Sequence, residues 1–148
     1  MGIVEFLEAR IAEDEAVAQD AGARAMEWRS SNGSVAGGGK PYVDDWSEDE
    51  PLTQYGGEVT IVYDEGWPED VEAEHIARQD PDRILREVAA KRKIINDHRV
   101  GSWYVYTDDD TRACETCGDS TVRWPCATIG ALAAIFSDHP DFNEEWRP

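Results

Sequence analysis

The sequence has few basic residues and no long apolar run, and each shortage excludes a class of protein. Only 14 of the 148 residues are Lys or Arg, against 32 Asp or Glu, which gives a formal net charge of −18. Because nucleic-acid binding relies on Lys and Arg to neutralise phosphates, direct binding of nucleic acid is not expected. No stretch approaches the ~20 apolar residues that a membrane-spanning helix needs. We therefore expect neither nucleic acid nor a membrane as a direct partner.

Cysteine is also scarce. Three cysteines are an odd number and too few for the disulfide framework of a small secreted protein. The first residues lack the basic start and the apolar run of a secretory signal peptide. Phe6 stands where an N-myristoylation motif requires Ser or Thr. We therefore expect a cytoplasmic protein.

Two short motifs resemble ligand-binding loops but lack essential residues. Three glycines precede Lys40, yet Pro41 stands where a phosphate-binding loop needs Ser or Thr. Asp108–Asp110 lack the glycine and the distant glutamate of a calcium loop. We therefore expect a flexible Gly/Ser loop over residues 30–40, a solvated turn at residues 108–110, and no nucleotide-binding residues.

The hydrophobic pattern predicts an α+β fold in a single domain over residues 1–148, with about three main helices and a small antiparallel sheet. Asp80 and Pro81 are residue types that begin a helix. Helical periodicity is present over residues 3–19, 71–78, 80–97 and 127–137. Short β-branched and aromatic stretches predict strands at residues 42–43, 58–63 and 102–107. Phe142 and Trp146 are expected to fold back onto the core.

The charges are unevenly distributed. Acidic residues gather at 44–50, 65–82 and 108–110, whereas half of the basic residues lie between Arg78 and Arg99. The basic strip on the helix over 80–97 comprises Arg83, Arg86, Lys91, Arg92 and Lys93. It is interpreted either as a solvated helix face with internal ion pairs or as a docking surface for an acidic partner. The acidic clusters favour solubility, with imitation of a polyanion as the alternative.

The clearest indication of site chemistry is Cys114-Glu115-Thr116-Cys117-Gly118. This spacing suits a tight turn that aims two thiolates at one metal ion. Cys126 follows nine residues later, and a short hairpin can return the chain from His98 to Cys114, 16 residues further on. We therefore predict a closed tetrahedral Zn²⁺ site formed by Cys114, Cys117, Cys126 and His98, in a zinc-knuckle region over residues 98–126. His75 and His139 stay open as alternative fourth ligands.

Two other interpretations of the cysteines stay open. They can be small buried apolar groups, or Cys114 and Cys117 can form a redox pair. If zinc is bound, a structural role is favoured over a catalytic one, because three thiolates make the metal a poor Lewis acid. No catalytic residue is predicted.

Three stretches resemble an uncharacterised family, a domain of unknown function found in actinobacteria and their bacteriophages. They run over residues 4–15, 74–95 and 124–148, and include Glu74-His75-Ile76-Ala77-Arg78-Gln79-Asp80-Pro81. The resemblance implies an intracellular protein that is bacterial or phage-encoded, in the latter case acting in the host cytoplasm. It implies no activity, substrate or catalytic residue.

The leading hypothesis is a non-enzymatic accessory protein with structural zinc that binds a host protein. Its candidate contact surfaces are the acidic clusters and the strip at Arg83, Arg86 and Lys93. A small zinc- or thiol-dependent enzyme is the first alternative. An acidic inhibitor that mimics nucleic acid is the second.

Overall fold

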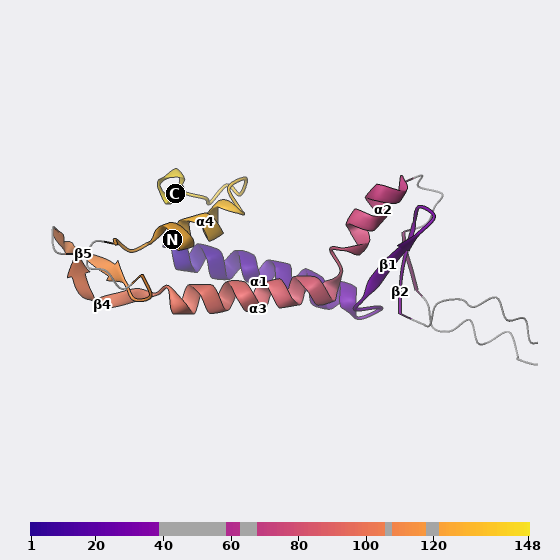
Figure 1. The fold of residues 1–148 in the computed structure, drawn as a ribbon, viewed down its shortest axis with the longest axis horizontal. Coiled ribbons are helices and arrows are strands. Elements are labelled where there is room, and N and C mark those ends of the chain that lie inside the picture. Colours follow the sequence, from indigo (N-terminus) through magenta and orange to yellow (C-terminus); the bar gives the residue numbers. More distant parts are fainter. Residues whose placement is uncertain (39–58, 63–67, 106–107, 118–121) are drawn as a thin grey trace, which may run out of the picture. The chain divides into compact units, whose positions relative to one another are not determined.

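The computed structural model describes residues 1–38, 59–62, 68–105, 108–117 and 122–148 (Figure 1). Within these residues it has four α-helices and two small antiparallel sheets, which confirms the α+β class. The chain divides into two compact units, residues 1–14 with 87–148 and residues 15–86. One domain over residues 1–148 stays a prediction.

The elements agree closely with the predicted helices. In chain order they are α1 (Ile3–Gly22), β1 (Trp28–Ser31), β2 (Ser34–Gly37), β3 (Val59–Val62), α2 (Asp70–Ala77), α3 (Pro81–Asp97), β4 (Val100–Val105), β5 (Asp108–Cys114), α4 (Ala127–Ala134) and the 3-10 helix η2 (Glu144–Trp146). The strand predicted at residues 42–43 lies outside the described residues. None of the described helices is both long and apolar enough to cross a bilayer.

A β-hairpin, not a loop, occupies residues 28–37. Strands β1 and β2 pair antiparallel around Asn32 and Gly33, which both have positive φ (47° and 71°). Asn-Gly is the residue pair that such a two-residue hairpin turn favours. The prediction of a loop over residues 30–40 is therefore wrong as far as Gly37, and residues 39–40 lie outside the described part.

The unit of residues 15–86 is organised around this hairpin. Strand β3 pairs with β2 to give the order β1-β2-β3, and α2 packs against β1 and β2. Its core contains Val35, Ala73 and Ala77. Asp80 caps α3 as predicted, because its Oδ1 accepts a hydrogen bond from the Arg83 backbone N–H at 2.7 Å.

The unit of residues 1–14 and 87–148 has an aromatic core. Phe6 on α1 is fully buried, with its ring centroid 6.1 Å from that of Phe142 and 5.1 Å from that of Trp146. The prediction that both C-terminal aromatic residues fold back is confirmed.

Strand β4 pairs with β5, so Asp108–Asp110 belong to a strand and the predicted turn there is wrong.

Most of the basic strip is occupied by ion pairs. Lys91 Nζ lies 3.3 Å from an Asp14 carboxylate oxygen, and Arg92 Nε lies 3.7 Å from one of Glu8. Two further pairs lie within α3 itself, between Lys93 and Asp97 and between Arg86 and Asp82. The two pairs within α3 agree with the interpretation of a helix face with internal ion pairs, whereas the pairs of Lys91 and Arg92 join α3 to α1.

Candidate metal centre

Four potential metal ligands lie together in the unit of residues 1–14 and 87–148. The Nδ1 atom of His98 is 3.6 Å from Cys114 Sγ, 3.7 Å from Cys117 Sγ and 3.5 Å from Cys126 Sγ. All four ligand atoms lie within 4.8 Å of one another. The sequence therefore identified the residues that the fold brings together.

These distances indicate a shared central point and not a set of hydrogen bonds. An imidazole nitrogen has either one lone pair or one N–H, so it cannot bond three thiols equally well. Zn–S bonds of about 2.3 Å and a Zn–N bond of about 2.0–2.1 Å in a tetrahedral site would place nitrogen and sulfur roughly 3.6 Å apart. The arrangement is therefore compatible with a metal site.

Two elements bring His98 and Cys114 together. His98 directly follows α3, and its backbone N–H still donates to the Ile94 carbonyl at 2.9 Å. The chain then runs out along β4 and returns along β5, in a register that pairs Val100 with Cys114. This confirms that a hairpin returns the chain from His98 to the first cysteine.

The turn from Cys114 to Cys117 is attached to the end of α3. The Glu115 backbone N–H donates to the Arg99 carbonyl at 3.0 Å, and the Thr116 hydroxyl donates to the Asp97 carbonyl. Glu115 also forms a side-chain ion pair with Arg99. The Arg99 hydrogen bonds lower the pKa of Glu115, so this carboxylate stays charged at neutral pH. Backbone and side-chain bonds thus position the first two thiols.

Cys126 is the residue immediately before α4 and is buried. Burial acts to raise the pKa of its thiol, but the Ile129 backbone N–H, the Cys114 thiol and His98 outweigh burial and lower the pKa to about 7. A helix N-terminus stabilises a thiolate because its unpaired N–H groups carry partial positive charge. Cys126 is therefore well suited to serve as a thiolate ligand.

The pKa of the Cys117 thiol shifts in the opposite direction. Burial raises the pKa of its thiol to about 12, and the neighbouring Cys114 and Cys126 add to the increase. Three thiolates this close together repel one another unless a cation lies between them. All three cysteines are free thiols, without a disulfide. The chemistry of the cluster is therefore compatible with a cation site.

The other two histidines lie elsewhere. His139 contacts Arg10, with 2.7 Å between its Nε2 and Arg10 Nη1, and its ring packs on Phe6. His75 is exposed on α2, in the unit of residues 15–86. Neither belongs to the cluster of potential ligands, so the geometry favours His98 over both alternatives.

The sequence interpretation missed Trp124, which supports the site without being a ligand. Its indole N–H donates to the His98 carbonyl oxygen at 2.9 Å, and its backbone N–H donates to the Arg112 carbonyl at 2.8 Å. These bonds connect the segment before Cys126 to both α3 and β5. The nearest signal in the sequence is the position of Trp124 two residues before a ligand.

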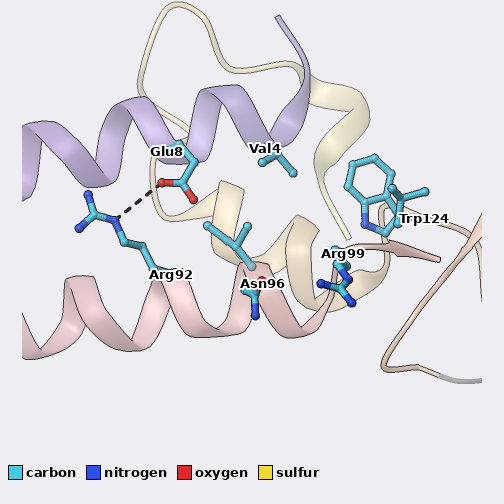
Figure 2. A pocket seen from close by; sticks show the side chains of 8 residues that line it. Val4, Glu8, Arg92, Asn96, Arg99 and Trp124 are labelled. Carbon is cyan, nitrogen blue, oxygen red and sulfur yellow. Dashed lines mark ion pairs between the residues drawn. The ribbon is translucent and has the colours of Figure 1, made fainter. Parts of the chain in front are cut away.

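A pocket adjoins the cluster of potential ligands in the same unit. Its volume is about 350 Å³, and Trp124 and Arg99 lie at one end, with the Glu8–Arg92 ion pair at the other (Figure 2). The lining residues come from α1, α3, the link between α3 and β4, β4 itself and the segment before α4. They comprise Val4, Glu8, Arg92, Ile95, Asn96, Arg99, Val100 and Trp124. Because these residues come from separate segments, the sequence pattern did not reveal the pocket.

The chain belongs to a family of unknown function. The family model described as "Family of unknown function (DUF6221)" matches residues 1–148. Comparison with curated proteins and with solved structures finds no match. The resemblance to a family of unknown function is thus confirmed, and its range among actinobacteria and their phages stays a prediction.

Proposed function

We propose that this DUF6221 protein is a non-enzymatic accessory protein that binds another protein and has a structural Zn²⁺ site. The observation that supports the metal site is the convergence of three cysteine sulfurs on one histidine nitrogen at 3.5–3.7 Å. The ligands of this site are Cys114, Cys117, Cys126 and His98.

The donor set favours zinc. Thiolates are soft ligands and imidazole is intermediate, and zinc combines both in four-coordinate structural sites. The cluster of potential ligands contains no carboxylate among the residues that the structure describes. Magnesium and calcium, which prefer oxygen ligands, are therefore poor candidates.

A structural role follows from the number and kind of ligands. Four protein donors fill a tetrahedral shell and leave no position for water or substrate, which a catalytic zinc site keeps open. Three thiolates also donate enough electron density to weaken the metal as a Lewis acid. The metal would instead join the end of α3, the end of β5 and the start of α4.

A thiol enzyme receives less support. Cys126 has the lowered pKa that a nucleophile needs, but it is only 3% exposed and its sulfur faces His98 and the other thiols. The imitation of nucleic acid depends on acidic clusters of which residues 44–50 lie outside the described part. Binding of a partner protein by a metal-stabilised fold, inside a bacterial or phage-infected cell, therefore remains the better proposal.

Metal content and thermal stability test the proposed site together. We expect one zinc per chain in the freshly reduced wild-type protein, and loss of that zinc with a lower melting temperature in Cys117→Ser and His98→Ala. His75→Ala is the matched control, because this histidine is exposed on α2 and should keep both metal and stability.

The other outcomes separate the alternatives. Zinc lost from Cys117→Ser without a change in melting temperature would favour a catalytic site. Absence of metal from the freshly reduced wild-type protein would contradict the proposal and leave three buried or redox-active thiols. Metal content would be measured by inductively coupled plasma mass spectrometry on untagged protein.

A further inference from the structure

The pocket beside the proposed metal site has an apolar wall that is open to solvent. Val4, Ile95 and Val100 line it, and Val100 is 47% exposed although it lies in a strand. Trp124 completes the wall, and because its indole N–H already bonds the His98 carbonyl, its ring adds apolar surface. A volume of about 350 Å³ is at the small end of ligand sites, which span roughly 300–1,000 Å³. Such a pocket suits one large apolar side chain.

Arg99 gives the rim of this pocket a positively charged hydrogen-bond donor. Its Nε and Nη2 groups donate to the two carboxylate oxygens of Glu115, which holds the planar guanidinium in one orientation. A guanidinium has five N–H donors, so Nη1 remains for a second acceptor. Because Glu115 fixes its orientation in advance, Arg99 loses little side-chain entropy when it binds a carboxylate.

The opposite end of the pocket has a second guanidinium. Arg92 pairs with Glu8 there, with 3.7 Å between Nε and the nearest carboxylate oxygen (Figure 2). The pocket is thus lined by two arginines and one glutamate, on a chain whose net charge is −18. At physiological ionic strength, repulsion by distant acidic residues is screened beyond about 8 Å. Contacts inside the pocket therefore determine which charges it accepts.

We propose that this pocket binds an acidic segment of a partner protein that inserts one aliphatic or aromatic side chain. The inserted side chain would pack against Val4, Val100 and Trp124, and a neighbouring Asp or Glu side chain would accept from Arg99. This inference rests on the proposed protein-binding function and specifies its site and the chemistry of the partner.

The proposed metal site lies next in the sequence to three residues of the pocket and its rim. Arg99 directly follows His98, Glu115 lies between Cys114 and Cys117, and Trp124 precedes Cys126 by two residues. A metal ion that fixes the four ligands therefore also fixes the wall and the charged rim. Removal of the metal is expected to weaken binding of the acidic segment without any contact between the segment and the metal.

A random peptide library tests the partner chemistry without knowledge of the natural partner. Dodecapeptides displayed on filamentous phage would be selected against the immobilised full-length protein, with its metal content measured in the same preparation. We expect the enriched peptides to share a large apolar residue flanked by Asp or Glu. Enrichment of basic or uncharged sequences, or no enrichment, would overturn the inference.

Matched variants then locate the bound peptide. For the most enriched peptide, synthesised with an amidated C-terminus, we expect Arg99→Gln to weaken binding by at least about tenfold, through loss of a charge-assisted hydrogen bond. Arg78→Gln is the control, because Arg78 is similarly exposed (69% against 61%) and also pairs with a glutamate. Val100→Ser should weaken binding, whereas Val71→Ser, at an exposed valine on α2, should not.

The outcomes distinguish this inference from the proposed function. Peptides that bind equally well to Arg99→Gln and to the wild type would place the interaction elsewhere, which overturns the pocket but not the protein-binding function. A protein that contains zinc but enriches no acidic peptide would overturn the inference and leave the metal centre intact. A preparation without metal would contradict the metal centre itself, whichever peptides bind.

Discussion

The two β-hairpins of this protein are stabilised in different ways. The β1–β2 hairpin turns at Asn32-Gly33 and packs against α2, with Val35 as its buried side chain. The β4–β5 hairpin instead ends at Cys114, opposite Val100 and beside His98. The first thus combines turn geometry with apolar packing, whereas the second ends among the residues of the proposed metal site. The same simple element can therefore have different sensitivities to mutation and to metal.

Removal of the metal is expected to have the largest effect, because it should destabilise the β4–β5 hairpin and not the β1–β2 hairpin. Structural zinc contributes roughly 10–16 kcal/mol in isolated zinc-finger peptides, so its loss should expose the β4–β5 hairpin. We expect a chelator to accelerate hydrogen exchange at the amides of residues 112–114 and to leave those of residues 34–37 slow. Equal acceleration in both hairpins would show that metal and apolar packing are not separate means of stabilisation.

Truncation of Phe6 should show how much the aromatic core contributes to the stability of the unit that contains the proposed metal site. Phe6 is fully buried among Phe136, Phe142 and Trp146, so Phe6→Ala should lower the free energy of unfolding by about 3–5 kcal/mol. Val17→Ala on the same helix is the control and should change it by less than about 0.5 kcal/mol, because Val17 is 70% exposed. Urea denaturation would measure both values. A small effect of Phe6→Ala would contradict the aromatic core.

Gly33→Ala should weaken the β1–β2 hairpin specifically. Gly33 has a φ of 71°, and a Cβ at this position would lie 2.8 Å from the Pro68 carbonyl oxygen. We expect a loss of about 1–3 kcal/mol of unfolding free energy, because alanine is strained in this conformation. Gly2→Ala, where the nearest neighbouring atom is 3.9 Å away, should have almost no effect. Similar melting temperatures for both variants would argue against this turn.

Removal of the Asp80 cap of α3 should lower the free energy of unfolding least. Asp80→Ala removes the acceptor for the Arg83 backbone N–H and should cost about 1 kcal/mol of unfolding free energy. Asp80→Asn keeps a side-chain oxygen at this position and should recover most of the loss. Thermal denaturation of both variants would measure the difference. Equal destabilisation would show that the charge of Asp80, or the hydrogen bond that its Oδ2 accepts from the Trp28 backbone N–H at 3.4 Å, matters more than the cap.

The sequence predicted the cluster of potential metal ligands better than the sheets. The three cysteines and His98 followed from the Cys-x-x-Cys spacing and from the short hairpin expected between His98 and Cys114, but only the geometry separated His98 from His75 and His139. The β1–β2 hairpin was missed because its Ser- and Gly-rich composition resembles a loop. The Asn-Gly pair was the available signal, since few other residues accept positive φ twice in succession.

The apolar positions of α1 show a second limit of sequence reasoning. Ile3, Phe6, Leu7 and Ile11 are buried as the helical pattern predicts, but Val17 is exposed and Ala18 is buried in its place. Residue 18 lies seven positions after Ile11 and thus continues the same face of the helix. Residue 17 is rotated by about 100° around the helix axis, away from that face. Val17 is the larger apolar residue, but the helical period places Ala18 on the buried face.

X-ray absorption at the zinc edge tests the central proposal most directly, because it identifies the atoms bound to the metal. The predicted result is three sulfur atoms at about 2.3 Å and one nitrogen at about 2.0–2.1 Å around each zinc in the wild-type protein. His98→Ala should give no zinc signal, because this variant is expected to lose the metal. A shell of oxygen and nitrogen atoms without sulfur, or no bound zinc, would contradict the assignment of Cys114, Cys117, Cys126 and His98 as the metal site.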